Sequence, residues 1–442
     1  MNHAVKRLSN MALLLLLAMM ASAQQEGDNQ LDVSLNMLGH GEMRIGGLDL
    51  TDGENSEGED HAYFLMERTR LSIDYKRTGL ETKVIAQHSG IWGEKGKGSF
   101  NLYEAWVKLN AKNGLFAQIG RQALSYDDEH IIGPNDWAMA ALSHDVLRTG
   151  YEGHGHKAHV ILGFNQNPEN TQGGTFYSGG SQPYKSMITA WYHYDVPKIP
   201  LGASVLFMNI GMQSGIKGGE GDNKPKNRHQ QLLGGYLSYC PGNLKTEASY
   251  YHQMGHNEDN IKIDAWMASF KTQWQITRRV SALGGFDYLS GDKYFAVPGK
   301  GMIGLVRHEA IKGFNPVYGS HHKFYGIMDF FYVSTYVNGF TPGLQNLYAG
   351  ATYNPVKNLS LKATYHYMAT ATKLKDMAMT LGHDIDVEAS YQIMKDARFT
   401  AGFSMMMGTE TMEKLKRADQ NNQLRWGWFS LVVSPRIFTT KW

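Results

Sequence analysis

The sequence predicts an all-β protein, a transmembrane antiparallel β-barrel of about 18 strands with short periplasmic turns and long extracellular loops. Three observations predict this fold class. Apolar and polar residues alternate along most of the chain, short and long polar links alternate between these segments, and tyrosine and tryptophan gather at the segment ends.

The alternation has a period of two, as in a strand whose successive side chains face opposite sides. In residues 359–367, for example, Leu359, Leu361 and Ala363 alternate with polar or charged residues. A soluble β-sandwich would show the same local pattern. Here, however, no segment reads as a strand buried on both faces, and Tyr75, Trp274 and other aromatic residues lie where the interfacial girdles of a membrane barrel are expected.

The links between the segments also alternate in length. Short links such as residues 77–80, 110–114 and 241–243 follow long polar ones, of which residues 127–144 and 293–343 are the most distinctive. Short turns at one end and long loops at the other are typical of outer-membrane barrels, and an even strand count places both termini on the periplasmic side.

The first residues have the composition of a secretory signal peptide. Basic residues precede an apolar run at 11–20 and a small-residue cleavage motif that ends at Ala23. Because the run is shorter than the roughly 20 residues that cross a bilayer as a helix, a membrane anchor is disfavoured. We therefore expect a signal peptide over residues 1–23 and a single outer-membrane barrel over residues 24–442.

The composition excludes several other classes of protein. The chain has 442 residues and one cysteine, Cys240, which rules out a disulfide framework and a cysteine metal cluster. Its 24 tyrosines and 9 tryptophans are too many for a disordered chain. A net charge of +2 gives no general attraction to nucleic acid.

Several motifs resemble the alginate-export family of outer-membrane channels. They are Gly-Arg-Gln at residues 120–122, Tyr-Asp-Asp at 126–128, Ile-Gly-Pro-Asn-Asp-Trp at 132–137 and His-Asp at 144–145. Residues 314–319, 322–326 and 329–331 look like the Bacteroidetes-type branch of that family. The resemblance implies a monomeric barrel in the outer membrane of a Gram-negative bacterium. It also implies transport of a polyanionic polysaccharide such as alginate, or of another anionic solute, past an arginine-rich constriction.

Turning the apolar side of each strand toward lipid leaves a lumen of mixed charge. Rings of basic side chains select for anions, and arginine binds carboxylates through two parallel hydrogen bonds. The candidate pore and substrate residues are Arg68, Arg70, Lys83, Arg121 and Arg148. Arg121 shares the side of Ile119, so it faces inward only if a bulge forms at Gly120. The alternative is that these charges pair with lumen acids and simply fill the wall.

The link at residues 127–145 supplies the candidate loop constriction. Its candidate residues are Asp128, Asp136, Trp137, His144 and Asp145. The acids allow a calcium ion, although their spacing fits no standard calcium loop. The alternative is that they pair with arginines and fold the loop inward, with Trp137 as its anchor. We expect no other cofactor or metal.

The segment at residues 293–343 is long enough that it must be packed or functional. It is rich in glycine and aromatic residues, among them Phe314, Tyr318 and Phe324. Two interpretations remain open: a lid or plug in the barrel mouth, whose aromatic rings stack on sugars, or a surface cap packed on itself.

The favoured function is a channel for anionic or polar solutes, with an acidic-polysaccharide exporter as its narrower form. The alternative is a non-transporting surface barrel that acts as a receptor or adhesin through its long loops. Enzyme function is disfavoured, because the adjacent Ser143, His144 and Asp145 cannot adopt triad geometry among themselves. Expected partners are outer-membrane lipid, anionic oligosaccharides, polysaccharides or small anions, and the barrel-assembly machinery, but not nucleic acid.

Overall fold

The structure is a computed structural model, and it describes residues 29–45, 61–94, 98–166, 184–213, 226–292, 310–331, 341–374, 376–416 and 424–442. The expected signal peptide at residues 1–23 lies outside the described residues, as do residues 293–309 and 332–340 of the long segment. Among the described helices, none is long and apolar enough to span a membrane.

The described chain is almost entirely β-structure. Its strands are β1 (Gln30–Ile45), β2 (His61–Arg77), β3 (Leu80–Ile91), β4 (Ser99–Asn110), β5 (Leu115–Gln122), β6 (His144–Gly153), β7 (His156–Phe164), β8 (Ser186–Asp195), β9 (Leu201–Gln213), β10 (Asn227–Tyr239), β11 (Leu244–His256), β12 (Lys262–Gln275), β13 (Val280–Leu289), β14 (Leu344–Val356), β15 (Leu359–Ala369), β16 (Thr380–Met394), β17 (Ala397–Gly408), β18 (Leu424–Val433) and β19 (Arg436–Lys441). The described helices are a single 3₁₀ turn, η1 (His321–Lys323), and α2 (Glu410–Lys416).

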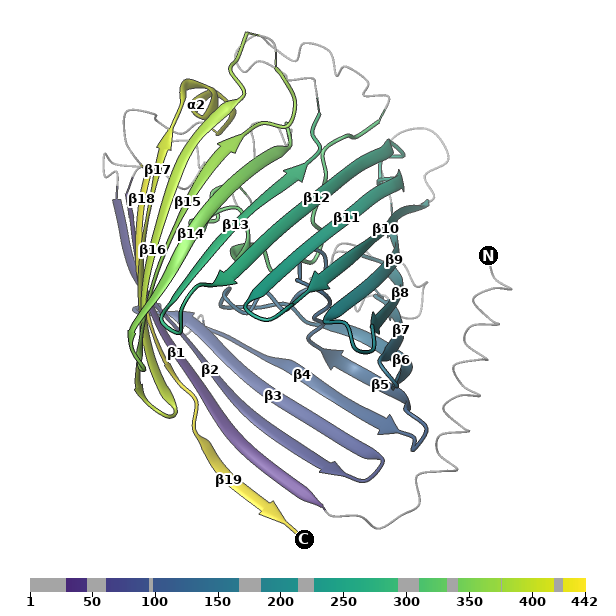
Figure 1. Cartoon of the computed structure of the whole chain (residues 1–442). Helices are drawn as coiled ribbons and strands as arrows, with labels where there is room; N and C mark the ends of the chain where they lie inside the picture. Colours follow the sequence, from purple (N-terminus) through teal and green to yellow (C-terminus); the bar gives the residue numbers. More distant parts are fainter. Residues whose placement is uncertain are drawn as a thin grey trace.

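All strands belong to one closed antiparallel sheet (Figure 1). Each strand from β1 to β17 pairs with the next, and β1 closes the barrel by pairing with β2 on one side and with β18 and β19 on the other. β19 continues β18 along β1 after Pro435, whose nitrogen cannot donate a ladder hydrogen bond. The two segments therefore form one interrupted strand, and the predicted 18-stranded barrel is confirmed.

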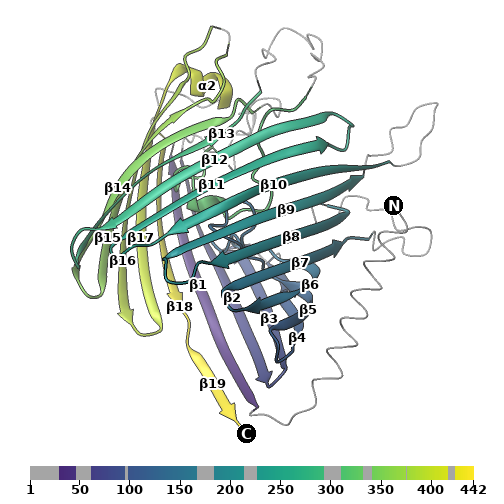
Figure 2. The ribbon, with the colours of Figure 1, turned by 45° about the vertical axis from the view of Figure 1, so that its right-hand side comes forward.

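The two ends of the barrel differ as the link lengths predict. Both views show the tight turns at one end, beside the start of β1 and the end of β19, and α2 at the other (Figures 1 and 2). The termini of the sheet are tied together, because Asn29 and Trp442 exchange two backbone hydrogen bonds of 2.9 and 3.1 Å.

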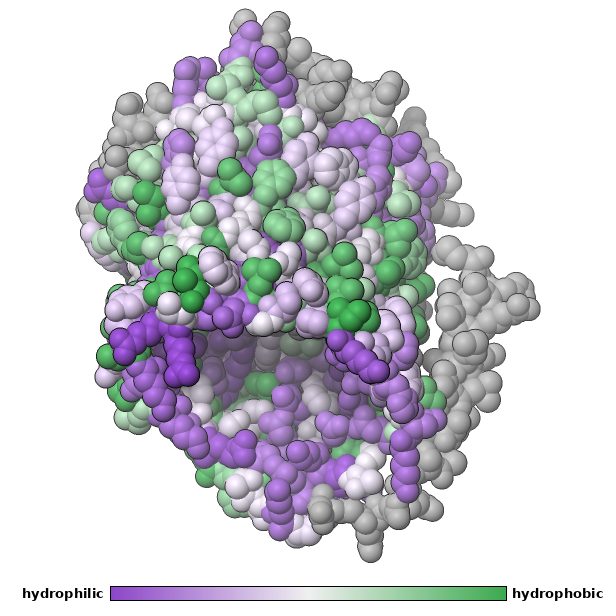
Figure 3. Space-filling model, viewed as in Figure 1, coloured by the Kyte–Doolittle hydropathy of each residue, from purple (hydrophilic) through white to green (hydrophobic). Residues whose placement is uncertain are grey.

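The strand faces divide as the alternation predicts. On β16, Ile385 and Val387 are exposed on the outer side, 37% and 42%, whereas Asp384 and Asp386 are buried on the inner side. Figure 3 shows the barrel hollowed at its open end, with hydrophilic side chains along the rim and inner wall. The outside is therefore apolar and the inside polar, as in a barrel that spans a membrane.

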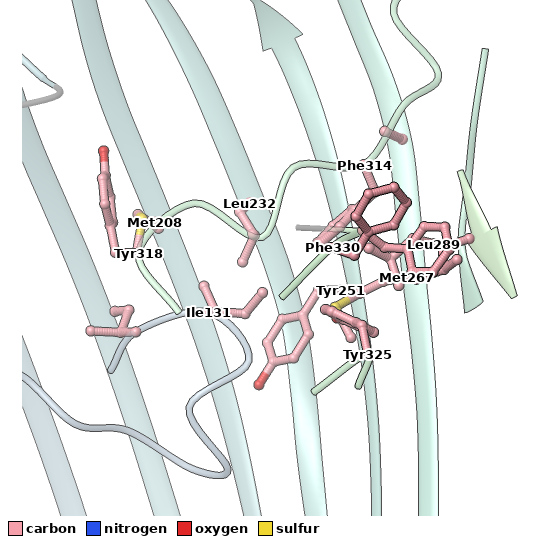
Figure 4. Packing of buried hydrophobic residues seen from close by; sticks show 14 of the residues in the cluster. Ile131, Met208, Leu232, Tyr251, Met267, Leu289, Phe314, Tyr318, Tyr325 and Phe330 are labelled. Carbon is pink, nitrogen blue, oxygen red and sulfur yellow. The ribbon is translucent and has the colours of Figure 1, made fainter. Parts of the chain in front are cut away.

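The main apolar core lies inside the barrel, where two inward-folded loops meet the wall. We call residues 123–143, between β5 and β6, the first inward loop, and residues 310–331, between β13 and β14, the second inward loop. Figure 4 shows Ile131 of the first loop and Tyr318 and Phe330 of the second among wall residues such as Met208 and Tyr251. Of the two interpretations of the long segment, its described part fits the plug.

We predict that a charge on the outer face destabilises the barrel far more than the same charge one residue away in the lumen. Val387→Arg places a guanidinium in lipid and costs about 2–4 kcal/mol of unfolding free energy at mid-bilayer depth. Glu388→Arg, the matched control, stays in water and changes stability by less than about 1 kcal/mol. Urea unfolding in lipid vesicles measures both. Equal losses for the two variants would contradict the assigned faces.

Candidate functional site in the barrel lumen

The two inward loops are held together by backbone pairing. Ile132 and Tyr318 form an isolated parallel bridge, in which the amide of Gly133 donates to the Tyr318 carbonyl at 2.9 Å and the amide of Tyr318 donates to the Ile131 carbonyl at 3.1 Å. Gly319 permits this close approach, since a Cβ there would lie 2.3 Å from the carbonyl oxygen of His130. The loops therefore form one packed body in the lumen.

His130 anchors this body electrostatically. Its Nδ1 lies 2.7 Å from Oδ2 of Asp128, its Nε2 lies 3.7 Å from Oδ1 of Asp287 on β13, and its ring stacks on Phe324 at 3.5 Å. Burial alone would lower the pKa of His130, but the charge of Asp128, the hydrogen bond to it and the contact with Asp287 together raise that pKa to about 9. His130 is therefore a buried cation at neutral pH.

A chain of polar side chains extends this anchor across the wall from β13 to β16. Asn346 donates to Asp287 at 2.8 Å, and its amide oxygen lies 2.9 Å from Nδ1 of His366. Nε2 of His366 lies 3.5 Å from Asp386, which also accepts from the backbone amide of Ile327 at 3.1 Å. The second inward loop is thus fixed to the wall through buried acceptors.

Arg68 and Arg70 converge on Asp136 of the first inward loop. Arg68 donates to the carbonyls of Asp136 at 2.8 Å and Ala138 at 3.1 Å, while Nη1 of Arg70 lies 2.6 Å from the Asp136 carboxylate. The two guanidiniums are nearly buried, whereas the Asp136 side chain is 53% exposed. Two arginines and one carboxylate leave the cluster with one positive charge, and they also fix the loop.

Trp137 secures the tip of the same loop against the seam of the barrel. Its ring stacks on His322 of the second inward loop at 3.8 Å and meets Trp428 of β18 edge-on at 4.8 Å. It also contacts His40 of β1 edge-on at 5.0 Å. This aromatic cluster joins both loops to the strands that close the sheet.

The other candidate pore residues lie apart from this cluster. Lys83 pairs with Asp74 at 3.3 Å on the inner wall, and Arg148 donates to Gln118 at 2.6 Å. Arg121 makes two 2.8 Å hydrogen bonds to Asp145, on the outer side that it shares with the exposed Ile119. No register shift occurs within the described pairing of β4 with β5, so Gly120 does not turn Arg121 inward.

The remaining loop candidates also have separate partners. Asp128 contacts His130, and Nδ1 of the buried His144 lies 3.1 Å from the Tyr184 hydroxyl. Within the described part of the chain, no group of three histidine, cysteine, aspartate or glutamate side chains is placed to hold a metal ion. Four of the five acids in residues 127–145 pair with cations, and Asp127 accepts hydrogen bonds from Trp191 and Tyr251. We therefore do not propose the calcium site considered from the sequence.

Several lumen cations have no hydrogen-bond or ion-pair partner in the described residues, and three of them lie together on one part of the wall. Lys271, Lys362 and Arg398 lie on the inner sides of β12, β15 and β17, and in the described ranges none of them makes a hydrogen bond or an ion pair. The strand alternation predicts their lumen position. Arg68 and Arg70 form ion pairs because the first inward loop places Asp136 beside them, and no local sequence pattern reveals that contact.

Two cavities border the inward loops. One of about 600 Å³ lies between the loops and β1, β2 and β16–β18, and its lining includes Arg68, Trp137 and Arg398. The other, of about 510 Å³, lies against β6–β10 and includes Arg148 and Lys157. Of the candidate pore residues, Arg68 lines the first cavity and Arg148 lines the second, so the candidates do not form one ring.

We predict that His130 makes stability fall at alkaline pH. Because its pKa is raised in the folded state, the stabilisation is complete below its unfolded value near 6.5 and is lost as pH rises through about 9. Thermal unfolding between pH 7 and pH 10 should show a smaller loss of stability for His130→Gln than for the wild type. His154→Asn, at an exposed turn, is the control and should match the wild type. An unchanged pH dependence in His130→Gln would contradict this assignment.

Comparison with known proteins identifies the family. A family model described as "Alginate export" matches residues 92–380. Solved structures of Pseudomonas aeruginosa share the fold: OpdL at a TM-score of 0.61 and 11% identity over 92% of this chain and 99% of that one, and OccK11 (OpdR) at 0.60 and 12% over 94% and 98%. OccK2 (OpdF), solved in complex with glucuronate, has a TM-score of 0.61 and 11% identity over 92% and 98%.

No curated protein matches the chain in sequence. The family match covers well over half of the residues, and it agrees with the closed barrel and its apolar outer face. The chain therefore belongs to the alginate-export family and is an outer-membrane β-barrel channel of a Gram-negative bacterium.

Proposed function

We propose that this channel passes anionic solutes, including acidic oligosaccharides, along a lumen whose unneutralised charge is basic. The observation that carries the proposal is that Lys271, Lys362 and Arg398, on the lumen side of the wall, form no ion pair within the described residues. Cations that are not neutralised by neighbouring carboxylates raise the local concentration of anions and favour their passage.

The loop cluster would add to this selectivity at the narrow part of the lumen. Arg68 and Arg70 share one carboxylate, Asp136, so one positive charge remains beside the cavity. Charges in a confined lumen interact more strongly than in bulk water, because the surrounding protein has a lower effective dielectric constant. Arg148 would contribute in the second cavity, whereas Lys83 is paired with Asp74 and Arg121 lies on the outer side.

Two comparisons support a uronate as the solute. The family model carries the description of alginate export, and the OccK2 structure contains glucuronate. Alginate and glucuronate both present a carboxylate on a sugar ring, which the planar guanidinium of arginine binds through two parallel hydrogen bonds. We propose this class of substrate for the present chain, as a monomer inserted by the barrel-assembly machinery and without enzymatic activity.

One observation favours the alternative of a non-transporting receptor or adhesin. The two inward loops are packed together and fixed to the wall by buried contacts, which would narrow the route through the barrel. A conductance measurement separates the two functions, since a receptor needs no continuous aqueous path.

We predict anion preference in planar bilayers. The refolded mature chain, measured under a salt gradient, should give a reversal potential displaced toward the anion equilibrium potential. Replacing Lys271, Lys362 and Arg398 together by glutamine should move that potential toward zero, because the unneutralised charges are gone. Lys395→Gln, at an exposed turn, is the control and should leave the potential unchanged. Cation preference in the wild type would contradict the proposal, and an absence of conductance would favour the receptor.

A further inference from the structure

The last strand of the sheet has one side that is not paired. β1 lies between β2 and β19, because residues 30–34 pair with residues 72–76 on one side and with residues 436–441 on the other. On its second side, β19 pairs with no strand within the part of the chain that the structure describes. We call this side of Arg436–Lys441 the β19 edge. Figures 1 and 2 show β19, in yellow, projecting beyond the turn that joins β16 to β17.

The β19 edge begins where the neighbouring hairpin ends. β17 starts at Ala397, which pairs with Val433, and the amide of Ser434 donates to the carbonyl of Asp396 at 2.8 Å. After this contact β19 continues past the tight turn, toward the periplasm. Backbone groups without a partner are not found in the hydrocarbon of a bilayer. The β19 edge therefore lies outside the hydrocarbon, where a periplasmic protein can reach it.

The antiparallel ladder determines which backbone groups point outward. Asn29 and Trp442 exchange both of their backbone hydrogen bonds, at 2.9 and 3.1 Å. Because hydrogen-bonded pairs alternate with non-hydrogen-bonded pairs along such a ladder, the amide of Thr440 also faces β1. The amides and carbonyls of Thr439 and Lys441 face the open side. The β19 edge thus offers both donors and acceptors to an incoming strand.

The side chains of β19 favour an extended partner. Ile437 and Phe438 are exposed, 58% and 51%, and two threonines follow them. β-Branched and aromatic residues have high strand propensity, and they pack well against side chains on a neighbouring strand. An uncovered edge of this composition is a template for pairing with another chain.

The charge around the β19 edge is basic. Lys395 and Lys441 are exposed at its two ends, and neither forms an ion pair within the described ranges. A guanidinium nitrogen of Arg436 lies 3.7 Å from the carboxylate of Asp32, and Asp396 is the second acid nearby. Three bases thus face two acids. Opposite charges on neighbouring strands stabilise their pairing, so an incoming strand with acidic residues at its ends complements this edge.

We propose that the β19 edge is the docking site for an extended, acidic segment of a periplasmic partner protein, which adds one strand to the sheet. Main-chain hydrogen bonds to Thr439 and Lys441 supply affinity, and side chains on alternate positions supply specificity. Acidic residues at the ends of the segment contact Lys395 and Lys441, and apolar residues between them pack on Ile437 and Phe438. The inference does not depend on the solute of the channel, because no lumen residue takes part.

Fluorescence anisotropy of the folded barrel in lipid nanodiscs tests the proposal with two labelled peptides. One has a central Val-Thr-Val-Thr-Val stretch with two glutamates at each end, and the other has lysines in place of the glutamates. We expect the acidic peptide to bind and the basic peptide to bind about tenfold more weakly, because like charges then meet across the strands. Absence of binding by the acidic peptide would overturn the proposal, as would equal binding of the two peptides.

Variants at position 439 test the backbone contacts. Thr439→Pro removes an outward amide and places a ring on the edge while leaving the hydrogen bonds to β1, so it should weaken binding of the acidic peptide about tenfold. Thr439→Val is the matched control. It removes the hydroxyl that donates to Asp32 at 2.5 Å but keeps the amide, so it should bind as the wild type does. Heat-modifiable migration on gels confirms that both variants are folded. Equal binding by the wild type and Thr439→Pro would overturn the docking site.

Hydrogen exchange followed by NMR tests the geometry of the wild type without a substitution. The amides of Thr439 and Lys441 should exchange fast and that of Thr440 slowly, and the acidic peptide should slow the first two. Slow exchange of Thr439 and Lys441 in the peptide-free protein would contradict the open edge.

Sedimentation velocity separates the other possible occupant, a second copy of this chain. We expect the wild type without peptide to sediment as a monomer. A wild-type dimer that Thr439→Pro abolishes would overturn the partner segment in favour of pairing between two copies.

Discussion

Closure of the sheet between β1 and β18–β19 is the constraint on which the rest of the molecule depends. In a bilayer every backbone amide and carbonyl must find a partner inside the protein, and a closed antiparallel ladder provides one for each. Closure then fixes the faces: one side of every strand meets lipid and the other meets the lumen. Even the interruption at Pro435 preserves the seam, because the amide of Leu35 donates to the Pro435 carbonyl at 3.0 Å.

A polar lumen in turn permits two long loops to fold inward. Their apolar residues pack on inward-facing methionine, leucine and tyrosine of β9–β12, while buried charges at His130 and Asp386 hold them in place. Arginines that sequence reasoning assigns to a solute, Arg68 and Arg70, bind the first loop through Asp136. The same side chains therefore position the loop and contribute positive charge beside the cavity that the loop borders.

The sequence predicts the fold well because strand alternation and link length are local properties. The strand ends at Arg77 and Leu80, and the inward faces of Lys362 and Arg398, follow directly from them. The site is predicted less completely, because its charge balance depends on contacts distant in sequence. Arg121 faces outward with Asp145, and Arg68 meets an acid 68 residues away. The position of Trp428 over Gly402 cannot be predicted from the local sequence, because it follows from the pairing of β17 with β18.

The proposed passage of solute along the lumen can be tested directly at the cavity beside β16–β18. In a Cys240→Ser background, a cysteine replaces Ser390, which lines that cavity. In a second variant a cysteine replaces Val387, which faces lipid. Both are treated with a negatively charged, membrane-impermeant thiol reagent during single-channel recording. We expect the current through Ser390→Cys to fall on labelling and the current through Val387→Cys to stay unchanged. An unchanged current through labelled Ser390→Cys would contradict the proposed passage.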